Sequence, residues 1–491
     1  MIATTLDELA RVVGGTVHGD GSVVVRGAAT VDSRDVEPDG LFVAVAGERV
    51  DGHDFAPTAL EAGAAATLGS RVVDGPCVVV DDVEVALGLL GASVVDRLTG
   101  CTVVGITGSQ GKTSTKDLLA QLLETAGPTV ATRGNLNNEL GVPLTLTRAD
   151  ETTRFLVVEM GARGLGNIAY LCGVAHPSVG VVLNVGTAHI GEFGSREVIA
   201  QTKGELVEAL PADGTAVISA DDALVAAMAS RTRASLLRFG RGADADVRAS
   251  DVAVDDEGRP TFVLEHAGER RPVRLPLLGE HQADNAAAAA AAALAVGLDL
   301  ETVARVLGGV ESRSAWRMER AQRDDGVVVV NDAYNANPES MRSALRTLAT
   351  MAERRRGRGW AVVGEMRELG ADADAEHAGV GRLAAELGLD LVVVGAEASA
   401  VAAGARDAGD GRGEVVLVPD VAAAVDWLAP RLSPVDAVLV KASRTVGLER
   451  AASGLLDAGG HTAAGASPAS PDLDAPHGPG HDAQNEGGHD R

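Results

Sequence analysis

The 491-residue sequence has few aromatic residues, cysteines and lysines. Phe, Trp and Tyr together make up 2% of the chain, so its cores must be built from the Val, Leu and Ala that dominate its 46% of hydrophobic residues. The three cysteines, Cys77, Cys101 and Cys172, show neither paired nor metal-ligand spacing. We therefore expect no disulfide framework, and scattered thiols suit a reducing compartment.

Long apolar runs and excess positive charge are also missing. No stretch of 18 apolar residues occurs, so we expect no membrane span. The acidic start MIATTLDELARVVGG lacks the apolar region of a secretory signal. A net charge of −26 argues against nucleic acid or an anionic membrane as the main partner. These absences predict a soluble, cytoplasmic protein.

Lysine is scarce even among the basic residues. Only four of the 43 basic residues are lysine, namely Lys112, Lys116, Lys203 and Lys441. An ammonium group is a compact point charge whose amine can become neutral and nucleophilic, unlike a guanidinium. Each lysine is therefore a candidate for a role that arginine cannot fill.

The order of apolar runs and turns predicts a three-domain α/β protein with a tail. Residues 1–98 alternate short strands with turn signals, typical of a small α/β domain. Residues 99–315 alternate buried strands with helices, which indicates a parallel sheet covered by helices. Residues 316–456 repeat this alternation as a doubly wound, Rossmann-like unit. Residues 457–491, rich in Gly, Pro, Ala and Asp, are expected to be a disordered tail.

Local composition predicts two helices in particular. The segment APTALEAGAAATLG, residues 56–69, has a helical pattern. Eight consecutive alanines, Ala286 to Ala293, predict a helix that begins near Asp284, because alanine is the best helix former.

The segment VVGITGSQGKTSTKDLL has the order of a phosphate-binding loop: a buried strand, a glycine turn and an amphipathic helix. It departs from the strict G-x-x-x-x-G-K-[ST] pattern because Ile106 occupies the first glycine position. In such a loop, backbone N–H groups and a helix N-terminus converge on phosphate oxygens. Lys112 would reach the β- and γ-phosphates and the Thr113 hydroxyl would bind Mg²⁺. The expected nucleotide contacts in the loop are Gly108, Ser109, Gln110, Gly111, Lys112, Thr113 and Ser114.

Polar residues follow other buried strands, where a doubly wound sheet places its ligands. Glu159 ends FLVVEM, and a carboxylate there suits Mg²⁺, which prefers oxygen ligands. His189 follows VVLNVGTA, but histidine is not a preferred Mg²⁺ ligand, so the residues alone leave a structural role equally open. Lys203 lies in the helical SREVIAQTKGELVEAL, where an unmodified lysine is most often solvated.

Together these segments resemble the Mur ligase family, the ATP-dependent amide-forming enzymes of peptidoglycan synthesis. The resemblance covers residues 1 to about 450, and VDSRDVEPDGLFVAVAGERVDGHDF resembles the uridine-nucleotide domain of the family. The matching segments are TGSQGKTST, GNLNNELGVPLTL, EMGARGLGNI, NVGTAHIGEFGS, TKGE, GEHQADNAAAA, NDAYNANPESM, GEMRELG and KASR. NDAYNANPESM and GEMRELG look like the branch that adds D-alanyl-D-alanine.

The resemblance implies an ATP-dependent ligase that joins D-alanyl-D-alanine to UDP-N-acetylmuramoyl tripeptide through an acyl phosphate. It implies ATP and Mg²⁺ as cofactors, and we expect a monomer. In several members the lysine matching Lys203 is carbamylated, which turns a cation into an oxygen ligand. The implied catalytic residues are Lys112, Glu159, His189 and Lys203, and the implied metal ligands are Thr113, Glu159, His189 and Lys203.

The resemblance also implies further binding residues. Around the nucleotide they are His281, Asn285, Arg317 and Asp332. Around the peptide substrates and the uridine diphosphate they are Ser33, Arg34, Asn135, Asn137, Asn138, Tyr334, Asn335, Asn337, Lys441 and Ser443. Two positions depart from the family pattern, Gln282 where Asn is common and Trp316 where glycine is usual.

Three alternatives stay open: a family member that adds the third amino acid, a folylpolyglutamate-type synthetase, and a P-loop ATPase that forms no bond. NDAYNANP and GEMRELG argue against the first two. An ATPase without ligase activity would need neither Lys203 nor a uridine-nucleotide domain.

Overall fold

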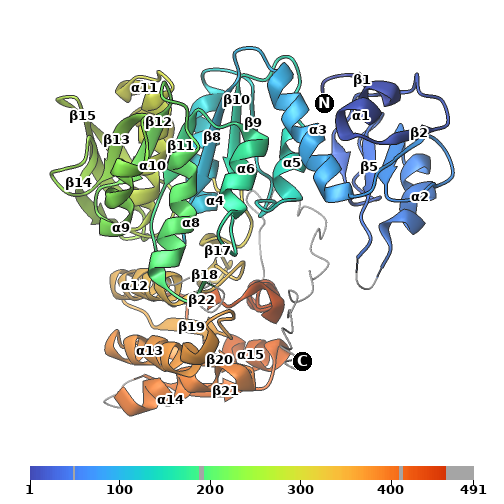
Figure 1. Cartoon of the computed structure of the whole chain (residues 1–491). Helices are drawn as coiled ribbons and strands as arrows, with labels where there is room; N and C mark the ends of the chain where they lie inside the picture. Colours follow the sequence, from blue (N-terminus) through green and yellow to red (C-terminus); the bar gives the residue numbers. More distant parts are fainter. Residues whose placement is uncertain (48–49, 187–192, 409–412, 460–491) are drawn as a thin grey trace, which may run out of the picture.

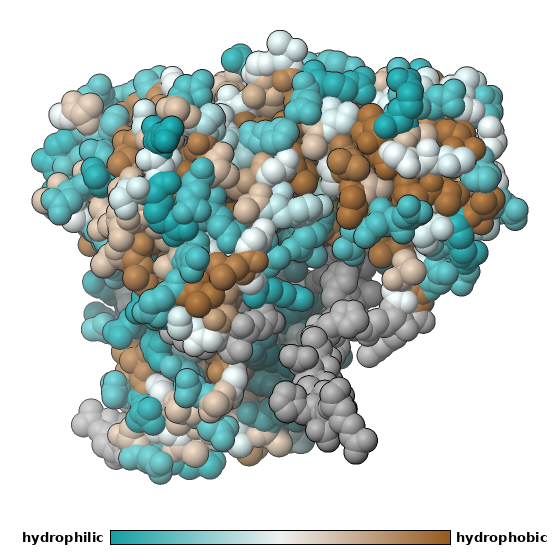
Figure 2. Space-filling view, viewed as in Figure 1, coloured by the Kyte–Doolittle hydropathy of each residue, from teal (hydrophilic) through white to brown (hydrophobic). Residues whose placement is uncertain are grey.

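The computed structural model describes residues 1–47, 50–186, 193–408 and 413–459, and its three main sheets lie in three consecutive parts of the chain (Figure 1). The first two parts lie side by side, and the third lies below the second in this view. On the face shown in Figure 2, hydrophilic side chains cover much of the surface and hydrophobic ones form separate patches. Within the described ranges, no helix is both long and apolar enough to cross a membrane. The predicted three-part α/β architecture is confirmed.

The first part holds a five-stranded sheet in the order β2-β7-β6-β5-β4. Its strands are β2 (Thr16–His18), β4 (Ala29–Thr30), β5 (Leu41–Ala44), β6 (Ala66–Gly69) and β7 (Cys77–Val79), beside a short ribbon of β1 (Thr4–Thr5) and β3 (Val24–Val25). Its helices are α1 (Leu6–Val13), α2 (Ala56–Glu61) and α3 (Val83–Arg97).

The predicted helix over residues 56–69 is wrong in its second half. Helix α2 ends at Glu61, and β6 then runs parallel to both β5 and β7. Gly63, with a φ of 113°, lies in the turn between α2 and β6. The strand is fully buried in the sheet, so tertiary pairing overrides the helix preference of Ala66 and of the two alanines before it.

The second part is a nine-stranded sheet in the order β16-β15-β14-β13-β12-β11-β8-β10-β9. The strands are β8 (Thr102–Thr107), β9 (Thr129–Ala131), β10 (Phe155–Glu159), β11 (Val179–Val182), β12 (Thr215–Ser219), β13 (Ser235–Gly240), β14 (Val247–Val254), β15 (Pro260–His266) and β16 (Glu269–Arg274). The helices include α4 (Lys112–Glu124), α5 (Gly141–Leu146), α6 (Asn167–Ala175), α8 (Arg196–Glu208), α9 (Ala223–Ala226), α10 (Gln282–Ala295) and α11 (Leu300–Leu307).

The sheet is parallel from β9 to β14, as predicted, but β15 and β16 are antiparallel. The connection from β15 to β16 consists of Ala267 and Gly268, both with positive φ. Two such residues form a tight hairpin turn, which joins only antiparallel strands. The expectation of a purely parallel sheet is therefore wrong at this edge.

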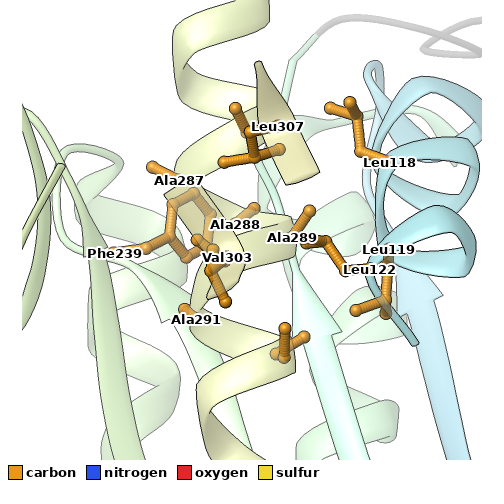
Figure 3. Packing of buried hydrophobic residues seen from close by; sticks show 14 of the residues in the cluster. Leu118, Leu119, Leu122, Phe239, Ala287, Ala288, Ala289, Ala291, Val303 and Leu307 are labelled. Carbon is orange, nitrogen blue, oxygen red and sulfur yellow. The ribbon is translucent and has the colours of Figure 1, made fainter. Parts of the chain in front are cut away.

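The alanine-rich helix α10 lies in the centre of the second part. It begins at Gln282, two residues before the predicted start, and all eight residues of Ala286–Ala293 are fully buried. Figure 3 shows these alanines among leucines of α4, Phe239 and residues of α11. A helix that is apolar all round is buried on all sides, and the small alanine side chain allows close packing with its neighbours.

The third part is a six-stranded sheet in the order β17-β18-β22-β19-β20-β21, with β17 antiparallel to β18. The strands are β17 (Glu319–Gln322), β18 (Val328–Asn331), β19 (Gly359–Val363), β20 (Asp390–Val394), β21 (Val415–Val418) and β22 (Ala437–Lys441). The helices are α12 (Pro338–Arg355), α13 (Ala373–Glu386), α14 (Ser399–Ala408), α15 (Val421–Leu428) and α16 (Glu449–Asp457). One apolar cluster joins α12, α13 and α14 and another joins α15 and α16, so the predicted doubly wound unit is confirmed. Of the predicted tail, residues 460–491 lie outside the described part.

Ala289→Leu should destabilise the central part by about 1–3 kcal/mol, because extra methylene groups in a closely packed core force neighbouring side chains out of their rotamers. Ala403→Leu, on an exposed position of α14, is the matched control and should change stability by less than about 0.5 kcal/mol. Urea unfolding followed by circular dichroism measures both. Equal effects of the two substitutions would contradict the packing described for α10.

Candidate active site

The phosphate loop lies at the carboxyl end of β8, between the parallel neighbours β10 and β11. Ile106 is fully buried within β8, which explains why the first glycine of the strict pattern is absent there. Gly111 is the N-cap of α4 with a φ of 81°, and a Cβ atom at this position would overlap Asn285 Oδ1. Gly108 is equally confined, because a Cβ there would lie 2.8 Å from Leu183 Cβ.

Asn184, which follows β11, holds the loop in shape. Its carbonyl oxygen accepts from Ser109 N at 3.1 Å, and its Oδ1 accepts from Gln110 N at 3.0 Å. Its amide Nδ2 donates to Gln110 O at 3.2 Å, and Gly186 N donates to Ser109 Oγ at 2.9 Å. Asn184 is not among the predicted site residues, although its position after a buried strand was a usable signal.

Glu159 is fixed at three points where β10 ends. Its Oε2 accepts from Thr113 Oγ1 at 2.8 Å, and its Oε1 accepts from Asn137 Nδ2 at 2.7 Å. Its backbone N donates to Thr132 Oγ1 at 3.0 Å, and only 2% of the residue is exposed. Both side-chain donors are neutral groups, so the carboxylate is held in place by hydrogen bonds.

Lys112 donates from Nζ to Gly108 O at 2.8 Å, within its own loop. Burial lowers the pKa of Lys112, the carboxylate of Glu159 raises it, and the charge of Arg317 lowers it again. The charges of Glu159 and Arg317 therefore both act on the Lys112 ammonium group.

Lys203 is buried in α8, with 5% of the residue exposed. It is therefore not the solvated lysine that is most common in a helix of this pattern. Among the described residues, no hydrogen bond or ion pair to its ammonium group is found. Burial lowers the pKa of Lys203 well below its usual range, and the charge of Lys112 lowers it further. Both effects disfavour the charged form, so the neutral amine, the form that can be modified covalently, is easier to reach here than in a solvated lysine.

Of the implied metal ligands, the structure describes Thr113, Glu159 and Lys203. His189 lies outside the described residues. Across the described ranges no three His, Cys, Asp or Glu side chains cluster in a way that could hold a metal ion. Thr113 Oγ1 and Glu159 Oε2 do converge, and hard oxygen donors of this kind suit Mg²⁺ that is shared with nucleotide phosphates.

His281 and Asn285 lie at the start of α10. His281 Nδ1 is 2.9 Å from Ser343 Oγ on α12, so it joins the second part to the third. Burial lowers the pKa of His281, although Asp332 and Asp284 raise it. Asn285 Nδ2 donates to Gln282 Oε1 at 2.9 Å, so the unusual Gln282 supports the residue beside Gly111.

The segment that enters the third part carries Trp316 and Arg317. The Arg317 guanidinium lies over the Tyr334 ring at 4.1 Å, and its buried Nε has no hydrogen-bond partner among the described residues. Trp316 has a φ of 58°, the left-handed region where glycine is favoured, and its ring stacks on Arg444 at 4.1 Å. The other departure from the family pattern thus adds a cation–π contact.

Several predicted binding residues have contacts within the chain. Lys441 Nζ pairs with Asp332 Oδ2 at 2.6 Å and donates to Asn335 O at 2.7 Å. Ser443 Oγ accepts from Arg367 N at 2.9 Å. Asn337 Oδ1 accepts from Ser340 N, the third residue of α12, at 2.8 Å and caps that helix. These contacts order the loops after β18 and β22, and substrate roles for these residues stay predictions.

The remaining predicted residues are more dispersed. Asn138 Oδ1 accepts from Gly141 N at 2.9 Å at the start of α5, and Asn135 O accepts from Asn137 N at 2.6 Å. Of the three asparagines, only Asn137 reaches Glu159. In the first part Ser33 is buried, while Arg34 is exposed and pairs with Asp32 at 2.6 Å.

Comparison with known proteins places this geometry in a family. Residues 28–86 match the Mur ligase family catalytic domain, residues 106–293 match the Mur ligase middle domain, and residues 316–444 match the Mur ligase glutamate ligase domain. The UDP-N-acetylmuramoyl-tripeptide--D-alanyl-D-alanine ligase of Mycobacterium tuberculosis (strain ATCC 25618 / H37Rv) is 46% identical, over 93% of this chain and 98% of that protein.

The chain belongs to the Mur ligase family.

Other family members agree along most of the chain. The ligase of the same name from Escherichia coli (strain K12) is 36% identical, over 82% of this chain and 88% of that protein. A crystal structure of MurF from Acinetobacter baumannii superimposes with a TM-score of 0.82 at 32% identity, covering 93% of this chain and 99% of that one. MurF ligase from Thermotoga maritima in complex with ADP gives a TM-score of 0.75 at 31% identity, covering 88% and 97%.

Gly111→Ala should lower the affinity for ATP by about tenfold or more, because the new methyl group overlaps Asn285 and strains a left-handed residue. Gly100→Ala is the matched control, since its φ of 76° is similar but no atom lies within 4 Å of the added Cβ. Isothermal titration with a non-hydrolysable ATP analogue measures both affinities. If the two variants bind equally well, the phosphate loop is not where the nucleotide binds.

Proposed function

We propose that this Mur ligase is an ATP-dependent enzyme that joins D-alanyl-D-alanine to UDP-N-acetylmuramoyl tripeptide and forms ADP and phosphate. The observation that carries the proposal is the phosphate loop anchored on Glu159, with the buried Lys203 beside Lys112. Support for the substrates comes from the relatives that bear this activity in their names and align over most of the chain.

The reaction needs an activated carboxylate, because amide formation in water is unfavourable. The terminal carboxylate of the tripeptide attacks the γ-phosphorus of ATP, and ADP leaves with an acyl phosphate formed. The amine of D-alanyl-D-alanine then attacks the acyl carbon, and the tetrahedral intermediate expels phosphate. Negative charge accumulates on phosphate oxygens at each step, and Lys112 with the N-terminal amides of α4 stabilises it.

We assign the metal-binding roles to Thr113, Glu159 and two further residues. Thr113 Oγ1 and Glu159 Oε2 would hold Mg²⁺. Lys203, carbamylated by CO₂, would supply an anionic oxygen ligand, and His189 would complete the set. Mg²⁺, when bound, neutralises phosphate charge.

The other roles follow the sequence analysis. We propose nucleotide contacts for Gly108–Ser114, His281, Asn285, Arg317 and Asp332. Peptide or uridine contacts are proposed for Ser33, Arg34, Asn135, Asn137, Asn138, Tyr334, Asn335, Asn337, Lys441 and Ser443. Domain limits at 1–98, 99–315 and 316–456 are supported by family matches that lie within them. We also propose a monomer in the cytoplasm, where ATP and a nucleotide-linked substrate are available.

Phosphate release from ATP should require both UDP-N-acetylmuramoyl tripeptide and D-alanyl-D-alanine, because the acyl phosphate turns over only when an amine attacks it. A coupled phosphate assay with each substrate omitted in turn tests this requirement. Running it with tripeptides that end in meso-diaminopimelate or in lysine identifies the third residue. Full turnover without the dipeptide would show an ATPase that forms no amide bond.

Lys203→Ala should lower kcat by about 100-fold or more, the range found when one charge-stabilising group of an active site is removed. Acetate or propionate should restore part of this activity, because a small carboxylate can replace the lost carbamate oxygens. Lys112→Ala is the matched control, since it removes a cation that no carboxylate can replace. A folded Lys203→Ala variant that carboxylates do not restore at all would contradict carbamylation.

A further inference from the structure

Lys116 lies one turn beyond Thr113 on α4, and only 3% of the residue is exposed. Its ammonium donates to Thr132 O at 2.8 Å and pairs with Asp117 Oδ1 at 2.7 Å. Its carboxylate partner is largely buried as well, with 14% of the side chain exposed. A buried ion pair of this kind stabilises a fold little in itself, so a role in function has to be considered.

The Lys116 side of this ion pair is connected to the nucleotide site through Thr132. Thr132, whose carbonyl binds Lys116, accepts the backbone N–H of Glu159 with its Oγ1 at 3.0 Å. Thr113 and Lys116 are three residues apart and lie on the same face of α4. Thr113 binds the Glu159 side chain, and Lys116 binds the residue that holds the Glu159 backbone. The position of Glu159 therefore depends on both.

The Asp117 side of the ion pair is connected to residues 311–314, the linker between the second and third domains. Asp117 uses its second oxygen, Oδ2, to accept from Ser314 Oγ at 2.6 Å. One turn further along α4, the Gln121 side chain donates to Glu311 O at 3.0 Å and accepts from Glu311 N at 2.9 Å.

The last turn of α4 also binds the linker. Arg313 binds Glu124 through two hydrogen bonds of 2.6 Å each. A second face of α4, formed by Asp117, Gln121 and Glu124, thus fixes residues 311–314 of the linker. Trp316 and Arg317 follow directly and contact the third domain.

We propose that Lys116 is a positioning residue that couples the nucleotide site to the interdomain linker through Thr132 on one side and through Asp117 and Ser314 on the other. A compact ammonium fits between these partners, whereas the planar, longer guanidinium of arginine would not. A shift of Glu159 on nucleotide binding would then move residues 311–314, the linker that carries the third domain. The inference deepens the proposed ligase function and rests on it.

A double-mutant cycle of Lys116→Met and Ser314→Ala, measured by phosphate release with both peptide substrates, tests the coupling. Lys116→Met keeps the length of the side chain and removes its charge. It should lower kcat by about tenfold, while KM for ATP changes by less than about threefold because the loop amides are intact. Ser314→Ala should lower kcat by about threefold in the wild type and by almost nothing beside Lys116→Met.

Arg271→Ala, which removes a distant surface contact to Glu301, is the control, and its effect should multiply with that of Lys116→Met. If Lys116→Met does not fold, Asp117→Ala takes its place in the cycle, because it removes both oxygens that bind Lys116 and Ser314. Multiplicative effects of the coupled pair in an active enzyme would overturn the inference alone. A wild type without substrate-dependent phosphate release would overturn the proposed function and the inference with it.

Discussion

Charge buried at the carboxyl ends of β8 and β10 is the constraint on which the rest of the structure depends. Glu159 and Lys203 are removed from water here, and Lys112 beside them is partly buried. An unpaired buried ion costs on the order of several kcal/mol. Thr113 of α4, Asn137 and Thr132 hold Glu159, and the loop carbonyl of Gly108 accepts from Lys112. Asn184 holds the loop itself. The large apolar core around α10 keeps those elements close enough to do so.

The positions of the four lysines are consistent with this constraint. Lys116, Lys203 and Lys441 are all buried. Lys116 and Lys441 each bind a backbone carbonyl and a carboxylate, whereas Lys203 is affected by the positive charge of Lys112. A guanidinium needs more space and stays charged, so arginine would not serve at these positions. Several of the arginines form ion pairs near the surface, such as that between Arg313 and Glu124.

Much of this could be predicted from local sequence, because a strand, a glycine turn and a helix form from neighbouring residues. The phosphate loop, the place of Glu159 at a strand end and the N-terminal proline of α12 are of this kind. The burial of Lys203, the strand β6 and the support of Asn285 by Gln282 depend on contacts between distant segments. Helical periodicity and alanine content carry no information about such contacts.

The central claim is that ATP activates a carboxylate as an acyl phosphate before the amide bond forms. The most direct measurement uses UDP-N-acetylmuramoyl tripeptide with ¹⁸O at both oxygens of the reacting terminal carboxylate. It is incubated with ATP and D-alanyl-D-alanine, and the released phosphate is measured by mass spectrometry. The account predicts one ¹⁸O atom in each phosphate, because the oxygen that attacks phosphorus leaves with it. Phosphate that contains no ¹⁸O, released while ATP is consumed, would contradict the account.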